Sequence, residues 1–347
     1  MKGTPVTFIF DLLVLWIFIC LFRSLLDLRG SGEIKQLFFY NYSGISLFPV
    51  LFFIVGININ YFFLFNRIIF IYIIIVSLLS LFFVNYFEIQ IFLLMPLFYV
   101  ILTLPLRSGW NKLLILLISV FVVIVSLTNR AGIMRLMISY CIIAAYYVML
   151  NIKIHKRLLN IAVFCILMIP VFSLYLGMQG ESVFQIVLGE DTQPYSQLDP
   201  YSDTRTFLYF EVFQDLMHSK AHVFGKGLNA GYYSESFGTF SRGIVEVGFL
   251  QILLKTGILG TLLYLSVIIS AIFKALSKSR NLFIKSLGFL LASYVLMLFL
   301  ENVVAYNLLN IVTWIVVGMC HSEKIRELSN EGIRDLFNNI HNNSAVI

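Results

Sequence analysis

The sequence predicts an all-α polytopic membrane protein with about ten transmembrane helices and one large extracytoplasmic loop. Three observations predict this class. Of the 347 residues, 60% are hydrophobic, and the mean hydropathy is +0.92. Only 12% are charged, about half the share found in soluble domains. Apolar runs long enough to cross a bilayer recur along the chain. A cytosolic enzyme, a disulfide scaffold and a disordered chain are therefore excluded.

The apolar runs give the order of the predicted elements. A membrane-spanning helix needs roughly 17–25 residues, and the candidate runs lie near 6–22, 45–64, 67–84, 88–104, 112–128, 132–150, 158–176, 257–273, 282–300 and 302–320. The first run resembles a signal peptide, but Asp11 interrupts it and no small-residue cleavage site follows, so we predict that it is a span. Four segments result: an N-terminal bundle of about seven spans (1–176), a loop (177–256), three C-terminal spans (257–320) and an amphipathic cytoplasmic tail (321–347).

Basic loops predict the orientation of the spans, because Lys and Arg accumulate on the cytoplasmic side. Residues 153–157 and 274–285 each contain several bases and no acid. Both are therefore expected in the cytoplasm with the C-terminal tail, and the loop 177–243 is expected outside. The bases that follow the first span, beginning with Arg23, disagree, since alternation of spans places them outside. Either 36–64 contains a re-entrant pair of short segments, or the first four spans are counted wrongly.

The loop 177–243 is acidic and has its own predicted structure. It has four more acidic than basic residues, whereas the rest of the chain has a surplus of ten basic residues. Ser202 or Asp203 can cap a helix that runs to about Met217. Such a helix is expected along the outer membrane surface, because its apolar side chains fall near one face: Phe207, Phe210, Phe213, Leu216 and Met217.

Residues 243–255 predict a re-entrant half-helix that dips into the membrane from outside. This segment is apolar apart from Glu246, and the sequence Lys255-Thr256-Gly257 separates it from the next span. Irregular backbone at membrane depth is tolerated only where it lines a polar cavity. Arg242 and Glu246 are four residues apart, so in a helix they share one face. They form either a local salt bridge or a site in which the carboxylate accepts a proton from a sugar hydroxyl.

Four further bases are candidate ligands of an anion at the outer face. Arg130 lies at the outer end of the fifth span, where a base is unexpected, and Arg135 follows it into the sixth span. Arg205 begins the loop helix, and Lys255 lies at the tip of the half-helix. A guanidinium group can bind phosphate oxygens through two parallel hydrogen bonds. The alternatives are that Arg130 extends toward the lipid headgroups and that Arg205 pairs locally with Asp203 or Tyr209.

The stretch Gly225-Lys226-Gly227 is similar to a glycine-rich phosphate loop. No strand precedes it and its spacing differs from the dinucleotide fingerprint, so a tight turn that covers the site is the preferred interpretation. No D-x-D motif or cluster of metal ligands occurs in the outer loop. We therefore expect no metal and no cofactor. The net charge of +6 is explained by the cytoplasmic loops, so no nucleic acid partner is expected.

The order of these motifs resembles the superfamily of O-antigen polymerases and O-antigen ligases, which are bacterial surface polysaccharide enzymes. The matching stretches are 127–134, 202–216, 223–228 and 246–262, within roughly 125–265 of the chain. In the last stretch, Gly248-Phe249-Leu250-Gln251 and Thr256-Gly257-Ile258-Leu259-Gly260 are similar to the family's H-N-x-x-L-Q…T-G-x-x-G signature. The hydropathy layout also fits. The chain departs from the signature at Glu246 and Val247, where His and Asn are usual.

The resemblance implies a metal-independent glycosyltransferase in the bacterial inner membrane. Such an enzyme would polymerise O-antigen, capsule or exopolysaccharide repeat units that are carried on undecaprenyl diphosphate, at the extracytoplasmic face. Its partners would be the lipid-linked oligosaccharide, membrane lipid, a chain-length regulator and a flippase. A structural subunit of an assembly complex is one open alternative, and two further alternatives have a transfer or transport function. One is an O-antigen ligase, which the absence of His at position 246 disfavours. The other is a flippase or transporter of lipid-linked sugars, which the absence of an internal repeat disfavours.

The resemblance also implies roles for the candidate residues. Glu246 would deprotonate the acceptor hydroxyl, and Arg242 would hold Glu246 in place. The diphosphate leaving group would be stabilised by cationic side chains without a metal, above all Arg130 and Arg205, with Arg135 and Lys255 as additional contacts.

Overall fold

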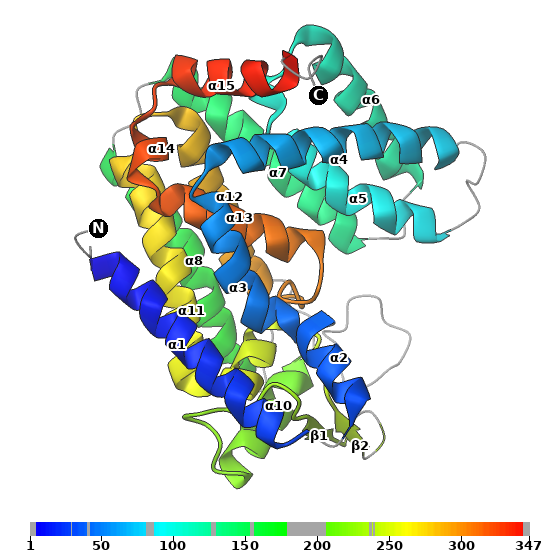
Figure 1. Cartoon of the computed structure of the whole chain (residues 1–347), viewed down its shortest axis with the longest axis vertical. Coiled ribbons are helices and arrows are strands. Elements are labelled where there is room, and N and C mark those ends of the chain that lie inside the picture. The colour runs from blue at the N-terminus through cyan, green and yellow to red at the C-terminus, as the bar shows by residue number, and fades with distance from the viewer. Residues whose placement is uncertain are drawn as a thin grey trace. The chain divides into compact units, whose positions relative to one another are not determined.

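In the computed structural model, helices make up most of the chain. The structure describes residues 5–28, 30–39, 42–80, 87–125, 130–152, 156–178, 206–235, 238 and 240–342. The helices are α1 (Pro5–Leu26), α2 (Ser31–Phe39), α3 (Ser43–Gly56), α4 (Ile59–Ser80), α5 (Phe87–Ile101), the short 3₁₀-helix η1 (Leu104–Leu106), α6 (Gly109–Val125), α7 (Arg130–Asn151), α8 (Lys156–Met178), α10 (Thr206–His218), α11 (Gly248–Lys278), α12 (Leu282–Leu298), α13 (Leu308–His321), α14 (Glu323–Glu327) and α15 (Asn330–Asn342) (Figure 1).

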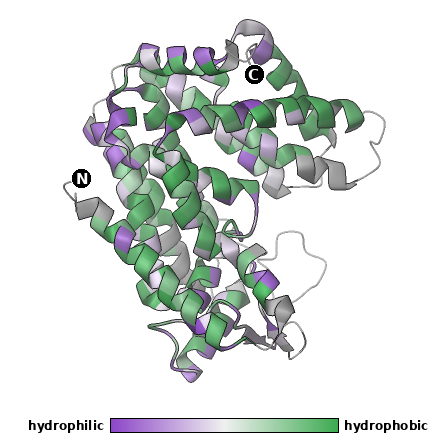
Figure 2. Ribbon diagram, viewed as in Figure 1, coloured by the Kyte–Doolittle hydropathy of each residue, from purple (hydrophilic) through white to green (hydrophobic). Residues whose placement is uncertain are grey.

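The apolar helices identify the chain as a multi-pass helical membrane protein. Within the described residues, five segments are long and apolar enough to cross a bilayer: Phe8–Leu26, Ile34–Gly56, Ile59–Ser80, Gly132–Asn151 and Gly248–Lys278. Shorter apolar helices accompany them, and hydrophobic residues cover most of the long helices (Figure 2). The predicted class is confirmed at this level.

The chain divides into two compact units. Unit 1 consists of Met1–Val50, Ala162–Ile269 and Tyr294–Asn310. Unit 2 consists of Leu51–Ile161, Ser270–Ser293 and Ile311–Ile347. Each unit therefore combines segments that are far apart in the sequence.

Two predicted spans have the wrong boundaries. The prediction placed a continuous run at 45–64, but α3 ends at Gly56 and α4 begins at Ile59. The reason is a side-chain cap: Asn58 Oδ1 accepts a hydrogen bond from the Asn60 amide, 3.1 Å away, and so satisfies a donor at the start of α4. The last predicted span, 302–320, likewise begins late, because Asn307 Oδ1 caps α13 by accepting the amide of Asn310 at 2.9 Å.

The segment between α10 and α11 contains a small antiparallel ribbon that the sequence did not predict. Strand β1 (Tyr232–Ser234) pairs with β2 (Phe240–Arg242), and Tyr232 lies opposite Arg242. The predicted half-helix at 243–255 is corrected, because the helix begins only at Gly248. It then continues to Lys278 with a break in its backbone at Gly257.

Helix α10 buries one side in a hydrophobic core. Its buried side chains include Leu208, Tyr209 and Val212, which belong to a core with Tyr232 and with the first turns of α11. Of the five apolar residues predicted to share a face, Leu216 belongs to this core, Phe207 and Phe213 pack against it, and Phe210 and Met217 are exposed. The predicted helix start at 202–203 lies outside the described residues.

The C-terminal tail forms two helices, α14 and α15. The apolar face of α15 packs against α4, because Ile333 and Phe337 are buried and the Phe337 ring meets that of Phe63 edge-on, with centroids 5.2 Å apart. Arg67 of α4 donates to the carbonyl of Ile340, 3.2 Å away. The amphipathic pattern of this segment therefore serves packing within unit 2.

Candidate active site

A break in helix α11 organises the site in unit 1. Gly257 has φ +71° and ψ −176°, a conformation that is open only to glycine. In a continuous helix the amides of Ile258 and Leu259 would bond four residues back. Here they donate to the carbonyls of His222 and Val223 instead, at 2.9 and 3.3 Å. The loop before the ribbon therefore receives the hydrogen bonds that the break releases.

The same loop also supplies donors for two carbonyls of α11 that precede the break. The amides of Lys226 and Gly227 donate to the carbonyls of Leu254 and Lys255, at 2.9 and 3.2 Å. This reciprocal exchange leaves these four backbone groups of the break paired, as a low-dielectric environment requires. Because these two amides are engaged with α11, they are not available to bind a phosphate.

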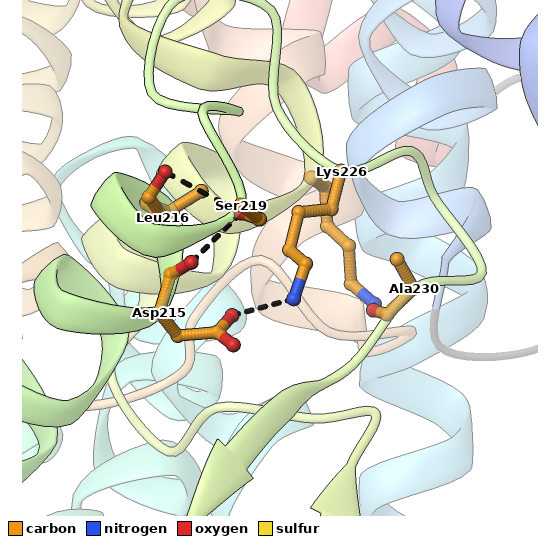
Figure 3. A network of polar contacts seen from close by, with 6 residues as sticks. Asp215, Leu216, Ser219, Lys226 and Ala230 are labelled. Atoms are coloured by element: carbon orange, nitrogen blue, oxygen red, sulfur yellow. Dashed lines mark hydrogen bonds and ion pairs between the residues drawn. The ribbon is translucent and has the colours of Figure 1, made fainter.

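The stretch 225–227 is a tight turn that lies directly against the break. Gly225 and Gly227 have φ +70° and +97°, in the left-handed region that favours glycine. A Cβ atom on Gly225 would lie 2.5 Å from both the Lys255 oxygen and the Gly257 nitrogen. Only glycine therefore lets the backbone of the turn approach the backbone of α11 this closely. Lys226 points to α10, where its Nζ bonds Asp215 Oδ2 at 2.6 Å (Figure 3).

Helix α1 fixes the turn from a third side. The Arg23 guanidinium donates to the carbonyls of Phe224 and Gly225, at 2.9 and 3.2 Å. Ser24 Oγ accepts the amide of Leu228 at 2.8 Å, and Trp16 Nε1 donates to the Thr256 carbonyl at 3.1 Å. The base that disagreed with the positive-inside rule therefore has a structural role beside the outer loop.

Lys255 is a fully buried cation next to this turn. Its side chain has 0% exposure. The ammonium donates to the Ala230 carbonyl and lies 4.3 Å from the centre of the Tyr42 ring. Within the described residues, no carboxylate pairs with it, and Lys226 is near enough to repel it. A buried charge without a counter-ion is costly, so an anion bound next to Lys255 would stabilise its charged form.

Arg242 and Glu246 form an ion pair, but not through a helix. Arg242 ends strand β2 and Glu246 precedes the first turn of α11, so the predicted shared helical face is wrong. The pair forms because the chain turns between them, which brings Nη2 and Oε1 to 3.3 Å. The Glu246 side chain is 45% exposed and that of Arg242 23%. The carboxylate is thus accessible.

The backbone around Glu246 is held rigidly. Val245 and Val247 are both fully buried, so the residue between them must face outward. Gln251 Oε1 accepts the Val245 amide at 2.6 Å, and Asn302 Nδ2 donates to the Val245 carbonyl at 2.8 Å. The Gln251 side chain, which belongs to the predicted signature, therefore positions the segment that carries Glu246.

Three polar residues beside the ion pair were missed by sequence reasoning. Tyr232 lies opposite Arg242 on the ribbon. Burial raises the pKa of the Tyr232 phenol; Arg242 opposes this shift, while Glu211 and Glu246 add to it. Glu211 is itself buried and accepts a hydrogen bond from Ser234 Oγ at 2.8 Å. Strands of three residues carry too little alternation to be recognised in the sequence.

Two contacts connect Lys255 with the ion pair. Ala230 accepts the hydrogen bond of Lys255, and the next residue, Gly231, packs so closely on Arg242 that a Cβ there would lie 2.6 Å from the Arg242 oxygen. On the other side, the Tyr42 ring contacts Lys255 while its hydroxyl would lie 2.6 Å from a Cβ on Gly243. Unit 1 therefore links Lys255 and the 225–227 turn with the backbone around Arg242 through a short series of contacts.

The three predicted arginine ligands are not placed at this site by the described residues. Arg135 lies in α7 within unit 2, where its Nη1 is 3.3 Å from Met95 Sδ. Arg130 begins α7, but its side chain lies outside the described residues, as does all of Arg205. Among the described residues, no group of three or more His, Cys, Asp or Glu side chains could hold a metal ion.

Comparison with known protein families, with characterised proteins and with solved structures finds no match to this chain.

Proposed function

We propose that this protein polymerises lipid-linked oligosaccharide repeat units at the extracytoplasmic face of the bacterial inner membrane. The observation that carries the proposal is the neighbourhood of Lys255, a buried cation without a carboxylate, and the accessible Arg242–Glu246 pair. A buried cation and an accessible carboxylate within one compact unit suit a reaction in which a hydroxyl is deprotonated while a diphosphate leaves. The resemblance to the polymerase and ligase superfamily supports the same reaction, with an undecaprenyl-diphosphate-linked glycan as the substrate.

The proposed step transfers one glycosyl group. The acceptor hydroxyl oxygen attacks the anomeric carbon of the growing glycan, and its proton passes to the Glu246 carboxylate. The bond between the anomeric carbon and the diphosphate oxygen breaks, and the diphosphate departs with the electron pair. Lys255 stabilises the developing negative charge through its field, which is strong in a low-dielectric interior. Arg130, Arg205 and Arg135 remain proposed diphosphate ligands.

The proposed topology has ten spans, with the loop 177–243 outside and the C-terminus in the cytoplasm. The contact of Arg23 with Phe224 and Gly225 supports the simple alternation of spans, in which the end of the first span lies on the same side as this loop. Reporter fusions after residues 27, 190 and 342 test the topology. Extracytoplasmic reporters at 27 and 190 and a cytoplasmic reporter at 342 are expected, and a cytoplasmic reporter at 190 would overturn it.

The proposed function is tested by complementing a deletion strain and analysing its surface polysaccharide on a gel. The intact gene should restore a ladder of long chains. Glu246→Gln should leave a single repeat unit on the lipid anchor, whereas Glu235→Gln, which removes an exposed acid of the same loop, should restore the ladder.

Two other outcomes identify the alternative functions. Long chains that accumulate on the lipid carrier in the deletion strain indicate a ligase. Lipid-linked units that remain on the cytoplasmic face indicate a flippase. A ladder that Glu246→Gln leaves unchanged would refute the assignment of the catalytic base.

A further inference from the structure

A second group of cations lies in unit 2, apart from the proposed active site. Lys274 and Lys278 lie in the last two turns of α11, His321 ends α13, and Arg326 lies in α14. We call these four residues the basic cluster. The sequence suggests only that this region is cytoplasmic, and the proposed reaction does not use any of the four.

Arg326 is the most unusual member of the basic cluster. The residue is 7% exposed, and within the described part of the chain its guanidinium Nε is fully buried without a hydrogen-bond partner. Its backbone is fixed, because its carbonyl accepts the amide of Arg280 at 2.8 Å. A buried guanidinium without acceptors is costly, so an acceptor from outside the chain is expected.

Lys274 increases the positive charge around Arg326. Its Nζ lies 3.3 Å from His321 Nδ1, and because an ammonium can only donate, the imidazole nitrogen must accept. Lys274 is near enough to Arg326 and Lys278 to be repelled by both, and Glu323 is the acid that opposes them. Glu323 is exposed, so it screens the cluster only weakly.

We propose that the basic cluster binds the phosphate group of an anionic molecule. A guanidinium and an ammonium side by side can give a phosphate several charge-assisted hydrogen bonds. The cluster includes Lys278, the last residue of the candidate membrane span Gly248–Lys278, and the end of a span is where lipid headgroups lie. The phosphate can therefore come from an anionic lipid headgroup or from a soluble phosphate compound.

Native mass spectrometry of the full-length protein in a neutral detergent tests this proposal. Phosphatidylglycerol, phosphatidylcholine and inorganic phosphate are added in separate titrations. Retention of phosphatidylglycerol in preference to phosphatidylcholine supports a lipid headgroup as the source. Binding of inorganic phosphate with no preference between the two lipids supports a soluble phosphate compound.

Charge-removing variants locate the binding. Arg326→Gln and Lys274→Gln should each weaken binding about fivefold. Lys324→Gln removes an exposed cation from the same short helix as Arg326 and should leave binding unchanged. If Arg326→Gln does not fold, Lys278→Gln at the exposed edge of the cluster provides the same test. Equal binding by the wild type, the cluster variants and Lys324→Gln, or no binding at all, overturns the proposal.

Discussion

Lys255 places an ionisable side chain in an interior position where a methionine of similar length would fit. Its ammonium bonds one carbonyl and contacts one aromatic ring, which offsets only part of the cost of burial. Replacing a buried charge by an apolar group is often neutral or stabilising. A buried ionisable side chain of this kind is therefore a candidate for a functional role.

Lys255→Met should therefore separate stability from activity. We expect the free energy of unfolding to be unchanged or raised by about 1–4 kcal/mol, while chain formation is lost in the complemented strain. Lys226→Met provides the contrast, because it removes a cation that has a carboxylate partner and should lower stability by up to about 1 kcal/mol. Thermal unfolding in detergent measures both. A strongly destabilised but active Lys255→Met protein would contradict a role in the reaction.

Gln251 holds the segment that carries Glu246 without contacting substrate in the proposed reaction. Gln251→Leu leaves the buried amide of Val245 without its acceptor, which should cost about 1–3 kcal/mol. We also expect shorter polysaccharide chains, because Glu246 loses its fixed position. Gln214→Leu changes an exposed glutamine of α10 and should affect neither. Wild-type chain length in a folded Gln251→Leu protein would remove the positioning role.

At the scale of elements, the loop 222–229, the end of α1 and the broken helix α11 behave as one structure. Each contributes hydrogen bonds that the others need, and the glycines at the break allow backbone to approach backbone. The ribbon β1–β2 and the first turns of α11 share a core with α10. The position of Glu246 therefore depends on elements from three parts of the sequence.

Gly257→Ala tests this arrangement. A Cβ atom would overlap the Val223 carbonyl, and the backbone conformation is strained for alanine. We expect a loss of about 1–3 kcal/mol or more. Gly109→Ala is the control, because no atom lies within 4 Å of a Cβ at that position, and helix propensity there favours alanine. Equal unfolding temperatures for the two variants would show that the break tolerates a side chain.

At the scale of the whole molecule, the proposed reaction relies on cationic side chains and not on a metal ion. The outer loop contains no D-x-D motif. We therefore expect that EDTA leaves the rate of polymerisation unchanged when the purified protein acts on lipid-linked repeat units. Added Mg²⁺ after EDTA should have no effect either. A rate that falls with EDTA and recovers with Mg²⁺ would require a metal site that the sequence does not predict.

The sequence predicts the helical membrane class well, because a long apolar run is a direct consequence of the bilayer. It predicts helix ends less well, since the side-chain oxygen of one residue such as Asn58 can cap a new helix within an apolar run. It singles out Glu246, Arg242 and Lys255, because charges are scarce in such a chain. It does not reveal the burial of Lys255 or the roles of Glu211 and Tyr232, which depend on contacts between distant segments.

The exchange of hydrogen bonds at Gly257 has a consequence for biogenesis. A helix that enters lipid with unpaired backbone groups pays several kcal/mol for each, and α11 has such groups at its break until residues 222–227 pair with them. The ribosome makes residues 222–227 before α11, so the backbone groups that pair with the break already exist when α11 emerges. We infer that the part of α11 around Gly257 enters the membrane together with residues 222–227. A chain from which residues 222–227 are deleted would then stall at insertion.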